Sequence, residues 1–243
     1  MAPFCQTLDQ PILRADNFGR PFEVVCLVDD EHVHLEAFRD AVRPWGIEIS
    51  EKEYWEELLG YDDIGGFEAI LRKAGRSPTR SELQMLLEAK RPHYMRRAKE
   101  SLRTFEGAAD LIRLRATCGP VAVVSGALTD EIIFGLEHLG VRALVPKIIS
   151  AEDTSISKPD PQGYLMGIEW LRSKIGSDAE RALVIEDSID GIVAAKAAAL
   201  PTVAVAHSYS LEELTHTKAD LVLPRLADIS EETLRELYQK LYG

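Results

Sequence analysis

Two adjacent carboxylates, Glu186 and Asp187, follow the apolar segment 182–185, which has the composition of a buried strand. Ser188 and a run of small residues come next and predict a helix. In open α/β sheets, ligands bind beyond the carboxyl ends of the strands, where paired acidic side chains can hold a divalent cation. Asp187 or Ser188 could instead simply cap the helix that begins there, so a metal site and a helix cap are both open interpretations.

Two more polar features occupy comparable positions. Ser125 and Gly126 end the apolar segment 121–125 and precede a helical pattern, so the hydroxyl and nearby amides can hold a phosphate, although Ser125 alone would be read as a helix cap. Lys158 lies in the loop 155–161, where a single lysine is usually a solvated charge. Together with the acidic pair, these groups supply the charge neutralisation, orientation and cation that phosphoryl chemistry needs.

Short apolar segments and helical patterns alternate through the second half of the chain, which is the arrangement that would position these groups. The segments lack polar alternation and predict a parallel sheet covered by helices on both faces, with right-handed crossovers. The expected strands are 121–125, 147–150, 182–185, 202–206 and 219–223. In the helix expected at 161–176, Leu165, Ile168 and Leu171 are in phase, and 229–243 predicts one more helix on the sheet.

Residues 33–101 contain several helical patterns and no convincing strand. Ser50 and Thr79 each begin a capping-box pattern, with a glutamate three residues later. A helical block inserted after the first strand of an α/β core predicts a cap domain. We therefore expect an α/β fold with a Rossmann-like core, formed by 1–32 and 102–243, and an all-helical cap formed by 33–101.

Composition narrows the class of protein. The chain has 243 residues, with 28 Lys and Arg against 40 Asp and Glu, and a net charge of −12. Because basic clusters are lacking, we expect no nucleic-acid or anionic-membrane partner. No long apolar span or signal-peptide pattern occurs, and Cys5, Cys26 and Cys118 are scattered without metal-ligand spacing. We expect a cytoplasmic monomer.

Four segments, in this order, resemble the haloacid dehalogenase (HAD) superfamily. They are LVDDEHVHLEAF at 27–38, VVSG at 123–126, SKPDP at 157–161 and IEDSIDG at 185–191. The closest likeness is to the small phosphatases and β-phosphoglucomutase-like enzymes that carry a helical cap after the first strand. The resemblance implies a Rossmann-like core, a Mg²⁺ cofactor, and hydrolysis or transfer of phosphate through an aspartyl-phosphate.

The resemblance also implies roles for the residues singled out above. Ser125 and Gly126 would contact the phosphate of a small phosphorylated metabolite, and Lys158 would stabilise its charge during catalysis. Glu186 and Asp187 would bind Mg²⁺. The family often has a histidine at the cap entrance.

His34 falls at this cap entrance and is therefore a candidate for substrate binding. A single histidine on a helix also has a purely structural interpretation. Both interpretations stay open at the level of sequence.

The first motif of the family is missing from the sequence as given. In the family, the first strand ends in Asp-x-Asp-Gly-Thr or Asp-x-Asp-Gly-Val, with the first Asp as nucleophile and the second as acid/base. The corresponding places, 22–26, read Phe-Glu-Val-Val-Cys, and neither Phe22 nor Val24 can do this chemistry. A slip of one residue puts Glu23 at the nucleophile position, but its longer side chain would misplace the carboxylate and Val25 still could not act as the acid.

The local pattern, taken without the family, places the first strand at 22–28 and ends it at Asp29, Asp30 and Glu31. Asp29 would then be the candidate nucleophile, with Glu31 two residues further on. Against this, the same residues resemble the flap that leads into the cap.

Three interpretations follow. In the first, the chain is a phosphatase-type hydrolase whose N-terminal segment is abnormal, for example through a reading-frame error upstream of Leu27. In the second, it is a non-catalytic relative that binds Mg²⁺ and a phosphorylated metabolite and acts as a binding or regulatory module. In the third, it is an enzyme that uses Asp29. The missing motif favours non-catalysis, whereas the intact remainder favours a hydrolase lineage. The substrate depends on cap side chains near 60–63.

Overall fold

Parallel strand pairs form the core of the protein in this computed structural model, which describes residues 28–243. Strand β3 (Ala122–Val124) pairs with β4 (Lys147–Ile149), and β5 (Val184–Glu186) pairs with β6 (Thr202–Val205), which pairs with β7 (Leu221–Leu223). The parallel pairing confirms the predicted α/β class. Within the described residues, β3 pairs only with β4, and β5 only with β6.

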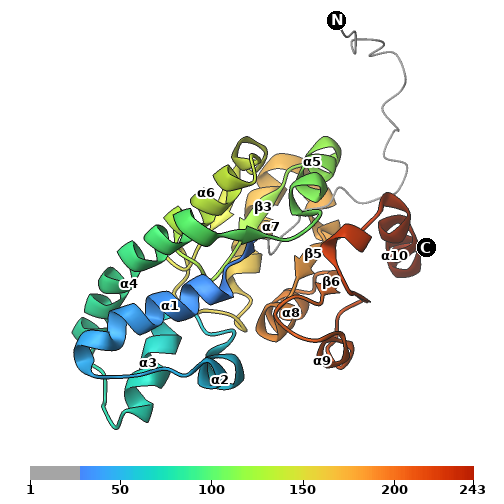
Figure 1. Ribbon diagram of the computed structural model, residues 1–243. Coiled ribbons are helices and arrows are strands. Elements are labelled where there is room, and N and C mark those ends of the chain that lie inside the picture. Colours follow the sequence, from blue (N-terminus) through green and yellow to red (C-terminus); the bar gives the residue numbers. More distant parts are fainter. Residues whose placement is uncertain (1–27) are drawn as a thin grey trace, which may run out of the picture.

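Helices cover both faces of these strands (Figure 1). Because side chains alternate along a strand, Val123, Ile185 and Val203 point to one face, whereas Val124 and Val184 point to the other. The first face packs against α5 (Ala108–Cys118), α6 (Thr129–His138) and α10 (Glu231–Tyr242). The second face packs against α7 (Gln162–Ile175) and α8 (Ile189–Ala197), and the short helix α9 (Leu211–Thr215) follows β6.

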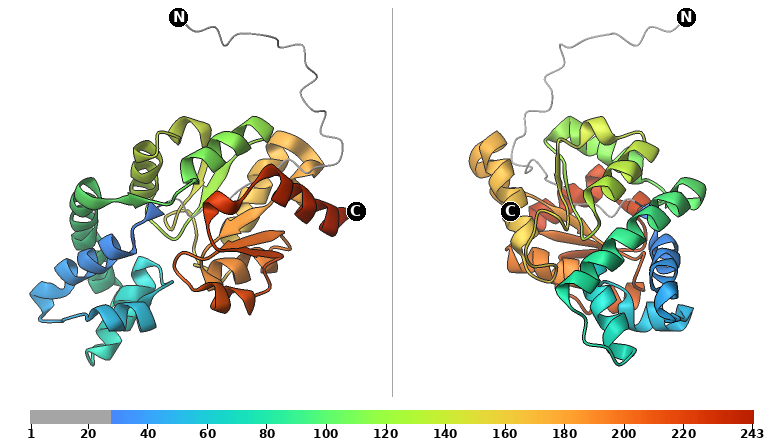
Figure 2. Two further views of the ribbon diagram at one scale, coloured as in Figure 1. Left: turned by 45° about the vertical axis from the view of Figure 1, so that its right-hand side comes forward. Right: turned by 90° about the vertical axis from the view of Figure 1, so that its left-hand side faces the viewer.

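Residues 31–101 form a helical region with a hydrophobic core of its own, including Phe38, Phe67 and Leu86. Its helices are α1 (Glu31–Val42), α2 (Glu51–Glu53), which continues into a π-helical turn at Tyr54–Leu58, α3 (Asp63–Lys73) and α4 (Arg80–Ser101). Figure 2 shows these helices grouped on the side of the molecule away from α10. Within residues 28–243, no helix is both long and apolar enough to cross a membrane.

The chain enters and leaves the helical region at one place. Strand β1 (Val28–Asp29) leads into α1, and β2 (Arg103–Thr104) follows α4. The two strands pair antiparallel, with Val28 opposite Thr104 and Asp29 opposite Arg103. These strands are therefore connections between the core and the helical region.

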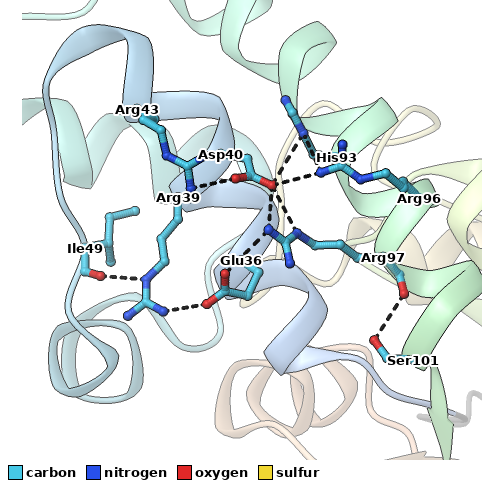
Figure 3. Close-up of polar contacts among 9 residues, drawn as sticks. All are labelled: Glu36, Arg39, Asp40, Arg43, Ile49, His93, Arg96, Arg97 and Ser101. Atoms are coloured by element: carbon cyan, nitrogen blue, oxygen red, sulfur yellow. Dashed lines mark hydrogen bonds and ion pairs between the residues drawn. The ribbon is translucent and has the colours of Figure 1, made fainter.

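A buried carboxylate joins α1 to α4 (Figure 3). Asp40, 6% exposed, accepts a hydrogen bond of 2.7 Å from Arg97 and pairs with Arg43 at 2.8 Å. Arg96 and His93 lie 3.2 and 3.5 Å from the same carboxylate. Burial alone would raise the pKa of Asp40, but Arg97 and the other basic groups hold it below its usual value. The side chain is therefore ionised and fixes the two helices together.

Candidate functional site

A cavity of about 220 Å³ lies where the carboxyl ends of β3 and β5 face the helical region. Its walls include the residues that the sequence singled out in the core, namely Ser125, Gly126, Lys158, Glu186 and Asp187. His34 lines the cavity from the helical region. The structure therefore brings these residues together, as expected for segments that end neighbouring parallel strands.

Lys158 is held at the acidic pair. Its Nζ donates a hydrogen bond to Glu186 Oε1 and lies 3.3 Å from the carbonyl oxygen of Val124. The hydroxyl of Tyr164 donates to the same Glu186 oxygen at 2.6 Å. Burial would raise the pKa of Glu186, but Lys158 and these hydrogen bonds lower it, so the carboxylate stays charged. Lys158 is thus not the solvated loop charge that a lone lysine would suggest.

The start of α8 completes the surroundings of Glu186. Its Oε2 accepts hydrogen bonds from the amides of Asp187 and Ser188, both at 3.2 Å, and from the Ser188 hydroxyl at 2.9 Å. The Ser188 Oγ in turn accepts the amide of Gly191 at 3.0 Å and so caps the helix. A Cβ at Gly191 would overlap the Glu186 carboxylate, so only glycine allows this approach.

Asp187 is therefore not the residue that caps α8. Its side chain is 5% exposed and accepts a hydrogen bond of 2.7 Å from Ser208, which follows the carboxyl end of β6. Of the two residues that could cap this helix, Ser188 is the one that does so. Two buried carboxylates remain side by side at the end of β5.

Ser125 lies in a turn before α6. Its amide continues the strand pairing by donating to the carbonyl of Ile149 at 2.9 Å, and its Oγ accepts the amide of Ala127 at 3.1 Å. The helix itself begins four residues later, at Thr129, with Leu128 as its N-cap. Ser125 thus organises the turn that faces the cavity and is not the N-cap of α6.

His34 belongs to a buried polar cluster. Its Nε2 lies 3.4 Å from Asp30 Oδ2, and its Nδ1 lies 2.8 Å from Lys90 Nζ. Lys90 is fully buried and also donates to Asp63 Oδ1 at 2.5 Å. Because Asp63 is its anionic partner, Lys90 is a neutralised charge behind the cavity wall.

Asp29 does not belong to the residues that line the cavity. It lies in β1, opposite Arg103, on the connection to the helical region. The next two residues, Asp30 and Glu31, do line the cavity. Asp29 thus lies where the flap leads into the helical region, and its role as a nucleophile stays a prediction. The positions of the missing motif, 22–26, lie outside the described residues.

Several residues of the site were not found by sequence reasoning. Tyr164 and Ser208 contact the acidic pair. Glu131 on α6 also lines the cavity. A signal existed for Ser208, because it follows the carboxyl end of a predicted parallel strand. The others depend on how helices pack, which no spacing in the sequence reports.

Comparison with known proteins identifies the family. A family model described as haloacid dehalogenase-like hydrolase matches residues 25–205. The chain therefore belongs to the haloacid dehalogenase-like hydrolases, and the resemblance seen in its motifs is confirmed.

The similar proteins include several of the phosphatase type. Protein CbbY of Cupriavidus necator is 30% identical over 222 residues and covers 84% of each chain. The phosphoglycolate phosphatase of Pectobacterium atrosepticum is 29% identical over 164 residues, or 67% of this chain and 68% of its own. Among solved structures, CbbY from Rhodobacter sphaeroides in complex with phosphate has a TM-score of 0.73 at 24% identity, covering 85% of this chain and 93% of its own. The chain is thus related to phosphatase-like hydrolases.

Proposed function

We propose that this protein binds a small phosphorylated metabolite together with Mg²⁺ in the cavity between the core and the helical region. The observation that carries the proposal is the meeting of Lys158 with Glu186 and Asp187 in the cavity that Ser125 and Gly126 also line. An ammonium group, a hydroxyl and turn amides can together neutralise and orient a phosphate. The kinship with phosphoglycolate phosphatase and with a CbbY structure that contains phosphate supports this ligand class.

The donor set fits Mg²⁺. Glu186 and Asp187 are buried carboxylates, and Asp187 is the better placed ligand because both oxygens of Glu186 already accept several hydrogen bonds. Mg²⁺ is commonly bound by one or two carboxylates while its other positions are taken by waters and substrate phosphate. Among the described residues, no group of three or more possible ligand side chains converges, so this partial set suits Mg²⁺ better than a fully enclosed ion. A bound Mg²⁺ would neutralise the charge of the phosphate oxygens.

We further propose that turnover by the chain as given is weak. A covalent phosphoryl route needs a carboxylate nucleophile and a positioned acid, and Phe22 and Val24 provide neither. Lys158 and the amides near Ser125 would still bind and orient phosphate. The second candidate is therefore a non-catalytic binding or regulatory module, which is favoured because Phe22 and Val24 carry no carboxylate.

The cellular setting is also a proposal. The net charge of −12 supports a small-molecule ligand and gives no support to a nucleic-acid partner. The exposed free thiol of Cys118 supports the reducing environment of the cytoplasm. We propose a cytoplasmic monomer.

The deciding experiment restores the missing carboxylates. We expect the unmodified protein to release little phosphate from p-nitrophenyl phosphate with Mg²⁺, and Phe22→Asp/Val24→Asp to release it about a hundredfold faster or more. Phe22→Asn/Val24→Asn is the matched control, since it is polar but supplies no nucleophile. Adding Lys158→Ala should remove the gain.

Three results would change the assignment. Fast turnover by the unmodified protein that Asp29→Asn abolishes would make Asp29 the nucleophile, despite its place in β1. Fast turnover that survives Asp29→Asn would point to Glu23 or to a water-based route. No phosphate release by the restored variant would favour the binding module.

A further inference from the structure

Basic side chains gather on the surface of the helical region where α1 meets α4 (Figure 3). We define the basic cluster as the arginines and the histidine that contact Asp40 or Glu36 of α1. They are Arg39, Arg43, His93, Arg96 and Arg97. None of these residues lines the cavity, so the basic cluster is separate from the proposed phosphate site.

The basic cluster holds more positive charge than its carboxylates neutralise. Within residues 28–243, its four arginines contact two carboxylates, those of Asp40 and Glu36. Because arginine stays protonated, two positive charges remain in surplus even when His93 is neutral. The chain as a whole has a net charge of −12 and therefore repels anions. This surplus makes the cluster a local site of attraction for an anion.

The carboxylate of Asp40 is fully occupied, whereas the two outermost arginines are not. Its Oδ1 lies 2.8 Å from Arg43, and its Oδ2 lies 2.7 Å from Arg97, 3.2 Å from Arg96 and 3.5 Å from His93. The side chains of Arg43 and Arg96 are 71% and 56% exposed, and each reaches Asp40 through Nη2. A guanidinium group carries five N–H donors, so most donors of Arg43 and Arg96 are available to a ligand from solvent.

The buried Asp40 holds these arginines in place before any ligand arrives. Arg43 of the α1 end and Arg96 of α4 contact the two oxygens of this one carboxylate, so a single short anion can reach both. Side chains that are already held lose less conformational freedom when they bind. Planar guanidinium donors also match the oxygens of phosphate groups, and a phosphate chain concentrates several negative charges over a short length.

From these contacts we propose that the basic cluster binds a chain of phosphate groups, with Arg43 and Arg96 as its main ligands. Free oligophosphate and the phosphate chain of a nucleotide share this chemistry. The proposal does not depend on what the cavity binds. Because the anion would join α1 to α4 from outside, as Asp40 does from inside, its binding should also raise the melting temperature of the protein.

The test is calorimetric titration of the full chain with tripolyphosphate, adenosine triphosphate and sulfate at one ionic strength. Mg²⁺ is left out, because it binds both phosphate chains and would promote binding in the cavity. We expect tripolyphosphate to bind at least about tenfold more tightly than sulfate. Equal binding of tripolyphosphate and adenosine triphosphate would identify the phosphate chain itself as the ligand, whereas tighter binding of the latter would identify a nucleotide.

Charge variants should shift the affinity in opposite directions. Arg43→Gln/Arg96→Gln removes the surplus charge and should weaken tripolyphosphate binding by about tenfold or more. Glu36→Gln keeps the length of the side chain but removes a negative charge beside the cluster, so it should tighten binding. Arg113→Gln is the matched control, because Arg113 is 52% exposed and pairs with Asp110 alone, at 3.0 Å. It should leave the affinity unchanged.

Three results would overturn the inference. They are no binding of tripolyphosphate by the unmodified protein, undiminished binding by the double arginine variant, and tighter binding of a hexaglutamate peptide, which would reassign the cluster to an acidic protein segment. Circular dichroism shows whether each variant is folded, and the single variants Arg43→Gln and Arg96→Gln decide the matter if the double variant is not. Phosphate binding in the cavity is a separate measurement, so the proposed function stands or fails independently.

Discussion

At the scale of single residues, Gly191 decides whether Glu186 can occupy its place. The first turn of α8 comes so close to the Glu186 carboxylate that a methyl group at Gly191 would overlap it. Lys158, Tyr164 and Ser188 hold the carboxylate from its other sides. The side chain therefore cannot move aside without losing several hydrogen bonds.

We predict that Gly191→Ala destabilises the protein. In an unconstrained helix this change stabilises by up to about 1 kcal/mol, whereas overpacking of a buried site costs about 1–3 kcal/mol. The sign of the change in the free energy of unfolding, measured with urea, separates the two effects. A more stable Gly191→Ala variant would show that Glu186 is free to rearrange.

The sequence indicated the main polar groups of the site because the end of a buried strand can be recognised from the change from apolar to polar residues. Ser125, Glu186 and Asp187 each follow a segment of four or so apolar residues, and Lys158 lies in a loop with a recognisable motif. Glu131 gave no such signal, since it is one of several acidic residues on an exposed-looking helix. Its burial results from the packing of α6 beneath the helical region, which depends on the whole fold.

At the scale of elements, the five strands and two helices expected in the second half of the chain lie within two residues of their expected limits. One helix face differs from its pattern: Leu165 is in phase with the buried Ile168 and Leu171, yet it is 50% exposed. The helix approaches β3 with its glycine side, where a Cβ at Gly163 would lie 2.7 Å from Val124 Cγ1. This close approach turns Tyr164 inward instead. Hydrophobic periodicity counts only apolar side chains, so it does not detect a helix face that packs through glycines.

The contact between α1 and α4 depends on Asp40, and we predict that Asp40→Asn loosens it. The change leaves Arg97 and its basic neighbours without their common anion, which should cost about 1–3 kcal/mol of unfolding free energy because the arginines are partly exposed. Urea unfolding gives the measurement. Glu68→Gln breaks an exposed pair with Arg72 and should cost less than about 1 kcal/mol. Equal costs for both changes would contradict a special role for Asp40.

At the scale of the whole molecule, stability should depend on pH through His207, which follows β6 and stacks on Phe105 with ring centroids 3.5 Å apart. Burial lowers the pKa of His207 to about 4, although Asp29 opposes this shift. The folded state therefore holds the neutral ring while the unfolded chain protonates near pH 6.5.

We predict that this contribution is complete above pH 6.5 and is lost as the pH falls toward 4. Its size should be roughly 1–2 kcal/mol after allowance for solvent screening. His207→Phe keeps an aromatic ring but cannot take up a proton, so the fall in unfolding free energy between pH 6.5 and 4 should be smaller than in the unmodified protein. Identical pH profiles would exclude the histidine as the cause.

Because helical and strand periods differ, the sequence predicted a helical block and a parallel core. It gave no sign of the cavity, whose lining combines Glu31 of α1, Asp63 of α3 and Glu131 of α6, which only the assembled chain brings together. The sequence also left the role of residues 22–26 open, because the local residue pattern makes them part of the first strand whereas the family motif makes them its catalytic end.

The pairing of β1 with β2 has a consequence for how such a protein can change. The two ends of the helical region, at Asp29 and Arg103, lie directly opposite each other, about 5 Å apart as paired strands are. A hairpin turn would span that gap, so the helical region is an insertion attached to the core through two adjacent strands. Replacement of this insertion would alter the ligand-facing surface while the core strands keep their order. Ligand recognition by the insertion and phosphate binding by the core can therefore evolve independently.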